Sequence, residues 1–369
     1  MATTNFGALS SAQKRVWASE LWQAGRDMNF FMSNGFVGSG SNNVIQRITE
    51  LTETERGRVC TMQLVGDIVS DGVVGDNMLE SQEESLFNDS QDIRIDQIRN
   101  GVRSRGRMAE QETVIRFRAV GKEKLSFWMA DKLDELMFLT VSGIAYTLNL
   151  DGSTRSGTSQ LPQLNFASDV AAPTSGRKAF AGAATSTATL TSSDTVTWNL
   201  LVSLQATAKR KRIKPVRSGG RDHYVVLLST EQCRDLKRDS TYQTIVSRAG
   251  PRGDSNPLFR GATAVVEGLI IYDHQKVPNT LGLASSSKWG ASGTVDGAQA
   301  LLLGSQALGF ATIGNTEMAE SDNTDYGNRP GMSVGRVIGM LKPGFKSIFD
   351  SNTRQDFGVI SLYTAAAAT

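Results

Sequence analysis

The sequence predicts an α+β fold for this chain of 369 residues, and three observations predict it. Residues 56–66 and 91–101 alternate or carry β-branched side chains, which is typical of strands. Residues 108–143 carry apolar side chains at three- and four-residue spacing, which predicts one long helix. Residues 222–239 combine a strand-like apolar run with a capped short helix. This length suits about two domains with substantial cores.

The composition is that of an ordinary soluble protein, with 39% hydrophobic and 21% charged residues. The longest apolar runs, such as Tyr224–Leu228, are far shorter than the roughly 20 residues that cross a bilayer, so we expect no membrane contact. The N-terminal sequence lacks the apolar stretch of a signal peptide, which makes the cytoplasm the expected compartment. Cys60 and Cys233 are too far apart for a CxxC motif and are expected to be buried, unpaired hydrophobic residues.

The N-terminal region predicts a short amphipathic helix, because Val16, Trp17, Leu21 and Ala24 have helical spacing behind a serine cap. This helix could be an arm. The following residues, 32–45, are rich in Gly, Ser and Asn and are expected to form a loop.

The two strand-like segments could pair as a long hairpin whose tip is strongly acidic. No basic residue interrupts the acidic residues of the tip, which are Asp67, Asp71, Asp76, Glu80, Glu83, Glu84, Asp89 and Asp92. Arginine then dominates the returning stem, at Arg94, Arg99, Arg103, Arg105 and Arg107. The net charge of +2 therefore hides large patches of opposite sign.

The predicted long helix would extend roughly 50 Å, with Gly121 as a plausible bend and Gly143 as its end. Residues 151–194 are mostly Gly, Ser, Thr and Ala, and are expected to form an extended surface excursion without a core of its own. A second helix should follow from Asp194 or Thr195 and end before Pro215. Its last turn and exit carry a basic run, where the helix dipole favours cations: Lys209, Arg210, Lys211, Arg212, Lys214 and Arg217.

The remaining sequence indicates a compact α/β module that extends to about residue 313, through apolar segments at residues 264–278 and 298–313. Residues 333–365 have strand-like ends around a Pro and Gly turn, so the chain is expected to return to a sheet begun earlier.

The sequence contains no motif typical of a catalytic site, a phosphate loop or a metal site. His223 and His274 are the only histidines, no GxSxG motif accompanies the serines, and the glycine spacing from Gly304 lacks the Lys and Ser/Thr of a phosphate loop. Three acidic residues could bind a hard cation, but their spacing differs from a calcium loop and a polar turn is favoured: Glu320, Asp322 and Asp325. We therefore predict no catalytic residue, no metal site and no cofactor.

The order of these features resembles the Hong Kong 97-like fold of tailed-phage major capsid proteins. Stretches such as "IKPVRSGGRDHYVVLLS" and "NPLFRGATAVVEGLIIYDH" are similar to recurring stretches of the N-four-like phage major capsid family, and such stretches cover most of residues 45–363. The resemblance implies five segments: an N-terminal arm at 1–55, an E-loop hairpin at 56–105, a P-domain with spine helix and excursion at 106–215, an A-domain at 216–330, and a C-terminal return to the P-domain at 331–369.

The resemblance also implies a structural protein that self-assembles into hexamers and pentamers of an icosahedral shell around phage double-stranded DNA. Its partners would be other copies of itself, scaffold, portal and decoration proteins, and DNA held by nonspecific contact. It would assemble in the host bacterial cytoplasm and reside in the virion. Some relatives join an E-loop lysine covalently to a neighbour's asparagine, but here no lysine occurs between Lys14 and Lys122, so noncovalent contacts are expected.

The basic run at residues 208–217 admits three interpretations. A solvated helix end explains some of the charge but not six cations in ten positions. Contact with the genome would give strong salt dependence and little sequence preference, since no aromatic residues interleave with the cations. Pairing with the acidic tip of a neighbouring subunit explains why the opposite patches nearly cancel, and is favoured. The alternative function is a non-enzymatic DNA-binding protein that uses residues 209–217.

Overall fold

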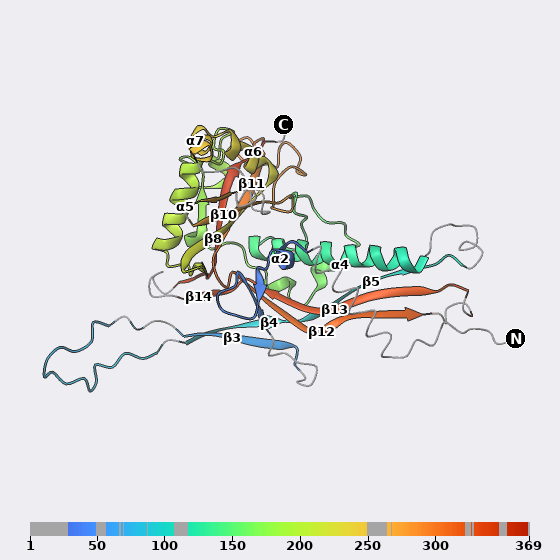
Figure 1. The fold of residues 1–369 in the computed structure, drawn as a ribbon, viewed down its shortest axis with the longest axis horizontal. Coiled ribbons are helices and arrows are strands. Elements are labelled where there is room, and N and C mark those ends of the chain that lie inside the picture. The colour runs from blue at the N-terminus through green and yellow to red at the C-terminus, as the bar shows by residue number, and fades with distance from the viewer. Residues whose placement is uncertain are drawn as a thin grey trace.

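The structure is a computed structural model. It describes residues 29–48, 57–65, 68, 70–86, 88–106, 117–248, 264–266, 268–321, 326, 328–346 and 353–367. The predicted arm helix, Asp67, and the predicted turn acids Asp322 and Asp325 lie outside these residues. The molecule is elongated, with a globular part above a long flat limb and a loop that projects from one end (Figure 1).

The limb contains a five-stranded sheet in the order β1-β2-β12-β13-β5. Its strands are β1 (Val37–Gly38), β2 (Ile45–Ile48), β12 (Leu308–Ser321), β13 (Gly331–Leu341) and β5 (Asp96–Arg103). The long helix α4 (Phe117–Ser142) lies along one face of this sheet (Figure 1). The short helix α2 (Phe30–Ser33) packs beside α4.

The predicted long helix is confirmed, with a described start at Phe117, since residues 107–116 lie outside the described ranges. It ends as expected, because Gly143 takes φ +69° and Ile144 N–H donates to the Leu139 carbonyl at 3.0 Å. The helix continues through Gly121, where a Cβ atom would lie 2.8 Å from Met332 Sδ. Close approach of the helix to β13, rather than a bend, accounts for this glycine.

The globular part contains a seven-stranded sheet in the order β6-β16-β11-β8-β10-β9, with β7 paired to β8. Its strands are β6 (Lys178–Phe180), β7 (Val216–Ser218), β8 (Arg221–Leu228), β9 (Ala264–Val266), β10 (Leu269–Asp273), β11 (Gly297–Leu303) and β16 (Val359–Ala365). The helices beside it are α5 (Trp198–Arg210), α6 (Thr230–Arg238) and α7 (Ser240–Arg248).

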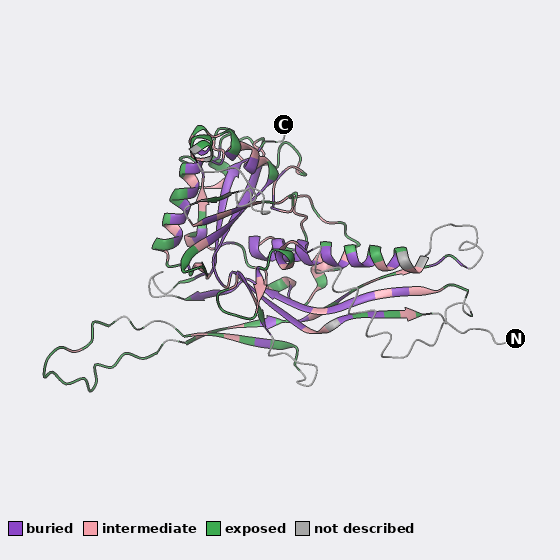
Figure 2. Cartoon of the chain, in the orientation of Figure 1, coloured by how far each residue is buried: buried purple, intermediate pink, exposed green. Residues whose placement is uncertain are grey.

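Alternate residues of the central strands enter two different cores. Val225 and Leu227 of β8 pack into the core that contains α4, whereas Val226 and Leu228 pack into the core that contains α5 and α6. The central strands are therefore buried on both faces, as Figure 2 shows in purple. A strand that is buried on both faces reads as a continuous apolar run.

The five predicted segments remain a prediction, and both sheets draw elements from more than one of them. Helix α5, assigned to segment 106–215, packs on the seven-stranded sheet, and so does β6. Strand β12, assigned to segment 216–330, belongs to the five-stranded sheet. Strand β16 pairs with β11 and β6 in the seven-stranded sheet. Turn signals mark where an element ends, but sheet membership depends on pairing between segments that are distant in sequence.

The predicted hairpin is present, and its returning strand is divided. β3 (Val59–Val65) pairs with β4 (Asn88–Arg94), and the chain changes sheet at Ile95 before β5 begins. Cys60, Ile93 and Ile95 pack in one small core with residues of the five-stranded sheet. Neither cysteine forms a disulfide bond and both are buried, as expected. Two short strands, β14 (Gly344–Lys346) and β15 (Arg354–Asp356), pair beside β4.

The excursion at residues 151–194 does not lie loosely on the surface. It forms four 3₁₀ turns, at Leu161–Gln163, Ala167–Asp169, Ser175–Arg177 and Thr187–Thr189, and contributes β6. Phe166 and Leu190 are buried. A few large apolar side chains are enough to hold the excursion because they enter cores formed by other segments.

An aromatic cluster joins α2 to α4 and to the end of β10. The Phe30 ring lies 4.4 Å from the His274 ring, which stacks on Phe138 at 4.9 Å. Phe30 N–H donates to the Asp134 carboxylate at 2.9 Å. Burial lowers the pKa of His274 to about 4, with help from Lys276, and burial raises the pKa of Asp134 to about 6. His274 is therefore a neutral packing residue at pH 7.

The variant His274→Phe keeps an aromatic ring but removes this titration. Because the folded-state pKa of His274 lies below its usual value of 6.5, its contribution to stability is complete above pH 6.5 and is lost as the pH falls toward 4. The difference in melting temperature between the wild type and His274→Phe should therefore change in favour of the variant between pH 7 and pH 4. Asp134 titrates in both proteins and cancels in this difference. A difference in melting temperature that stays constant from pH 7 to pH 4 would contradict the lowered pKa assigned to His274.

Candidate functional site

The most exposed described part of the chain is the segment between β3 and β4, residues 68–86, which we call the projecting loop (Figure 2). All of its described residues are exposed except Val73, which is half-buried. Its hydrogen bonds are local: Glu84 accepts from Ser70 N–H at 2.7 Å, and Glu83 accepts from Ser81 N–H at 2.8 Å. The loop therefore keeps a shape without packing on its own subunit.

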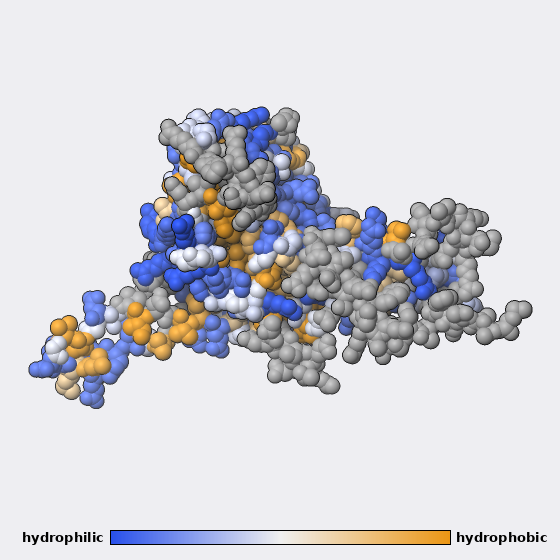
Figure 3. Space-filling model, in the orientation of Figure 1, coloured by the Kyte–Doolittle hydropathy of each residue, from blue (hydrophilic) through white to orange (hydrophobic). Residues whose placement is uncertain are grey.

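The projecting loop and its base carry large apolar side chains in solvent, and the sequence-based prediction of the site did not include them. Val74 is 79% exposed and Met78 is 72% exposed. The other exposed members of this set are Val65, Ile68, Leu79 and Leu86. Figure 3 shows them as an orange group at the end of the molecule. The sequence "DGVVGDNML" places apolar residues among acidic ones, which could have indicated an exposed apolar surface. A prediction made from charge alone overlooks these apolar residues. Contiguous exposed apolar surface marks a binding surface.

The structure divides the predicted acidic tip into two groups. Five residues lie in the projecting loop: Asp71, Asp76, Glu80, Glu83 and Glu84. Asp89 and Asp92 lie instead on β4. Asp89 accepts from Arg354 at 2.8 Å and from Lys346 N–H at 3.1 Å, while Asp92 accepts from the Thr61 hydroxyl at 2.7 Å. These two residues hold the stem in its own subunit.

The basic run lies at the end of α5 and beyond it. Lys209 and Arg210 form the last turn of the helix, and Lys211 is its C-cap. All six cations are exposed except Lys211, which is half-buried. Arg217 has an exposed contact of 3.2 Å with Asp222. In the described part of the chain, Lys209, Arg210 and Lys214 have no acidic partner.

The end of α5 places an arginine where a glycine is usual. Arg212 has φ +53°, its N–H donates to the Lys209 carbonyl, and Ile213 N–H donates to the Ala208 carbonyl, both at 3.0 Å. This hydrogen-bond pattern is a Schellman motif, whose left-handed position favours glycine. An arginine at this position costs conformational energy relative to glycine.

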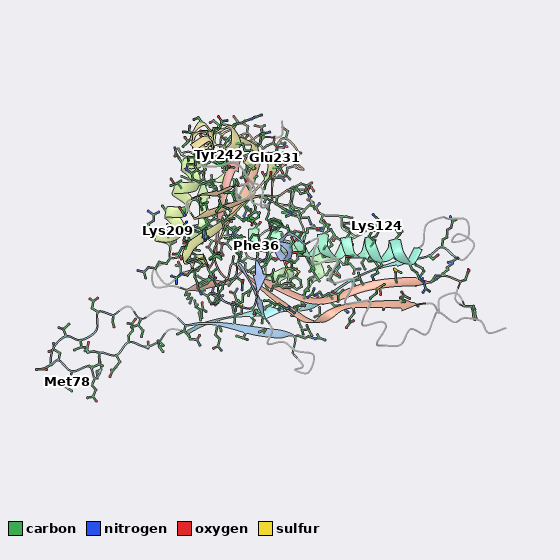
Figure 4. The ribbon with its side chains drawn as sticks, viewed as in Figure 1. Phe36, Met78, Lys124, Lys209, Glu231 and Tyr242 are labelled. Carbon is green, nitrogen blue, oxygen red and sulfur yellow. The ribbon has the colours of Figure 1, made fainter. Side chains whose placement is uncertain are left out.

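The acidic and basic surfaces do not meet within one subunit. Figure 4 shows Met78 at the far end of the projecting loop and Lys209 on the globular part, apart from it. Among the described residues, no ion pair joins the loop to the basic run. The same described residues contain no group of three metal-binding side chains and no helix long and apolar enough to cross a membrane.

The chain, with its extended loop and elongated limb, is similar to capsid proteins of phages. A family model described as phage capsid protein matches residues 5–368. The major capsid protein of Pseudomonas phage KPP25 is 42% identical over 373 residues, which cover 98% of each chain. The capsid of Ralstonia phage GP4 is 27% identical, with a TM-score of 0.76 over 100% of this chain and 99% of that one. The Cyanophage Pam1 capsid has 18% identity and a TM-score of 0.71, over 100% and 97%.

The fold is the Hong Kong 97-like capsid fold, and the chain belongs to the phage capsid protein family. The sequence-based recognition is thus confirmed. Because the relatives are structural capsid proteins, the predicted structural, non-enzymatic role is confirmed as well.

The variant Arg212→Gly should stabilise the subunit by about 0.5–1 kcal/mol, because glycine takes the left-handed conformation without a Cβ clash. Arg212→Ala is the matched control, since it removes the same charge but keeps the Cβ atom. Urea unfolding of the folded subunit measures both variants. Equal stability of the two variants would contradict the role assigned to the backbone conformation of residue 212.

Proposed function

We propose that this protein assembles through its own surfaces into hexamers and pentamers of an icosahedral shell that encloses phage double-stranded DNA. The observation that carries the proposal is the projecting loop, whose described residues are exposed apart from the half-buried Val73 and include large apolar side chains. The similar proteins are capsid proteins, which supports the same conclusion. Scaffold, portal and decoration proteins are the further partners that a shell of this kind would need.

The projecting loop is the proposed inter-subunit contact. Burial of an exposed Met, Leu or Val side chain contributes roughly 1.5–3 kcal/mol, so a few such side chains stabilise a contact appreciably. A closed shell repeats each contact in many symmetric copies, so interactions that are weak alone hold the assembly. The acidic residues beside the apolar ones would set the register and exclude wrong partners by charge.

The basic run is a second proposed surface, and it faces either a neighbouring subunit or the genome. Lys209, Arg210 and Lys214 are exposed and have no acidic partner among the described residues, which supports an external anionic partner. A DNA-binding protein that forms no shell is the alternative function, and the same residues would carry it.

Replacement of residues 70–85 by a short Gly/Ser linker should leave a folded subunit that forms no closed shells. The replacement spares β4, because Asn88–Arg94 pair with β3 and hold the stem. Circular dichroism checks the fold, and negative-stain microscopy checks assembly. A matched control carries only Gln82→Ser, at an exposed loop residue outside the acidic and apolar sets, and should assemble. Normal shells from the replaced chain would refute the proposed contact.

Neutralisation of Lys209, Arg210, Lys211 and Arg212 by glutamine should weaken assembly more at low salt than at high salt, because salt already screens surface charge attraction. The measurement is the yield of shells at two salt concentrations, with and without DNA. If empty shells form normally while DNA retention falls, the run faces the genome. Discrete DNA complexes of the wild type in place of shells would instead favour the alternative function.

Mature particles should be held by noncovalent contacts. No lysine lies between Lys14 and Lys122 to form an isopeptide bond from the hairpin, and the two cysteines are buried and form no disulfide bond. Boiled particles should give one band near 39.8 kDa on a denaturing, reducing gel. A ladder of covalent oligomers would contradict the proposal.

A further inference from the structure

We infer that the Asn100–Gly101 peptide of β5 is a site of spontaneous modification, where the asparagine side chain closes on the backbone and is converted to aspartate or isoaspartate. Three features of the molecule carry this inference. They are the contact between the two residues, the position of β5 at the edge of its sheet, and the charge on both sides of the dipeptide.

The backbone nitrogen of Gly101 lies next to the side-chain amide of Asn100. The Gly101 N–H donates to Asn100 Oδ1 at 2.9 Å. The carbon that carries this oxygen, Cγ, is the atom that the nitrogen attacks when a cyclic imide forms, so the reacting groups are held together in the folded chain. Glycine brings no side chain that would obstruct the approach.

The Gly101 N–H faces the open edge of the five-stranded sheet, where β5 is the last strand. Gly101 pairs with Ser333 of β13, and a Cβ atom at Gly101 would lie only 3.3 Å from Ser333 Cβ. Such a close approach is typical of a non-hydrogen-bonded pair, in which each N–H points away from the partner strand. The nitrogen is therefore free of the ladder, and β5 has one neighbouring strand to release when the ring closes.

The other Asn–Gly dipeptide of the chain, Asn34–Gly35, has the opposite arrangement. Asn34 Nδ2 donates to the Phe30 carbonyl at 2.8 Å, and Gly35 N–H donates to the Met32 carbonyl at 3.1 Å. Both reacting groups are thus held by other partners at the end of α2. Asn34 is exposed whereas Asn100 is half-buried, so exposure alone would favour reaction at Asn34. The two sites therefore separate the effect of local geometry from the effect of exposure.

Two arginines flank the reacting dipeptide. Arg99 and Arg103 are exposed and stand two residues before and after Gly101, which is about 7 Å along an extended chain. In the part of the chain that the structure describes, neither arginine has an acidic partner. Negative charge develops on the Gly101 nitrogen as it loses its proton, and then on the amide oxygen as the new bond forms. Nearby cations stabilise this charge.

The reaction needs no reagent except water. The Gly101 nitrogen loses its proton and bonds to Asn100 Cγ, the bond between Cγ and Nδ2 breaks, and ammonia leaves with the proton. Water then opens the cyclic imide at one of its two carbonyl carbons. Opening at Cγ gives aspartate, and opening at the main-chain carbonyl carbon gives isoaspartate, which has one extra carbon in its main chain.

Isoaspartate at this position would disturb the pairing of β5. Asn100 pairs with Val334 of β13, while Ile98 and Val102 pack against the core that contains α4. An extra main-chain carbon between Ile98 and Val102 moves one of them out of register with β13 and with this core. Modified subunits should therefore unfold at a lower concentration of urea.

The test incubates the folded subunit in heavy-oxygen water at mildly alkaline pH, followed by digestion in ordinary water and peptide mass spectrometry. Only molecules that open the imide during the incubation take up the label. Conversion of Asn100 should exceed that of Asn34 by about fivefold to tenfold, because hydrogen bonds hold both reacting groups at Asn34–Gly35. In the urea-unfolded chain, the two sites should convert at similar rates.

Two outcomes would overturn the inference. Equal conversion of the two sites in the folded subunit would show that the dipeptide sequence, and not the contact in β5, decides the reaction. No conversion of Asn100 in the folded subunit, over a time in which the unfolded chain reacts, would show that β5 protects the site.

The structural consequence has its own variants. Asn100→Gln, whose longer side chain closes a ring less readily, should keep its urea midpoint during the incubation, while the midpoint of the wild type falls. Asn100→Asp is the matched control, because it carries the charge of the product without the extra main-chain carbon, and it should start at the stability of fresh wild type. An equal fall for wild type and Asn100→Gln, or a fresh Asn100→Asp as unstable as the incubated wild type, would overturn the assignment of isoaspartate.

Discussion

The structure depends on the burial of one sheet from both sides. Strands β8, β11 and β16 send alternate side chains into two cores, one built with α4 and the limb, the other with α5 and α6. This shared layer joins the globular part to the limb. Without it, α4 would have only the five-stranded sheet as a partner, and α5 would have no sheet to pack on.

The exposed apolar side chains of the projecting loop lie far from this shared layer. The projecting loop stands beyond the small core around Cys60 and Ile93, and its described apolar side chains are exposed. A chain that folds around one shared layer and leaves these side chains in solvent can bury them by contact with other molecules. The apolar residues of the shared layer thus account for the fold of the subunit, and the apolar residues of the loop are those proposed to join subunits.

The sequence predicted the local elements well. Helical spacing and Gly143 located the end of α4, and alternation located β3. The sequence did not predict the partition into two sheets, because β6, α5 and β16 join the globular part through pairings between distant segments. It also overcounted the acidic tip: Asp89 and Asp92 are bound within the stem, and only tertiary contacts with Arg354 and Thr61 reveal this. The apolar side chains of the loop were visible in the sequence, but their exposure is a property of the fold.

The central claim is that the projecting loop is free in the isolated subunit and buried against a neighbour in the shell. Amide hydrogen exchange of residues 70–86, compared between isolated subunits and assembled shells, tests it most directly, because exchange reports the opening of each backbone amide. The account predicts fast exchange of this segment in the subunit and strong protection in the shell, while β8 and β11 are protected in both. Equally fast exchange of the segment in both states would contradict the account.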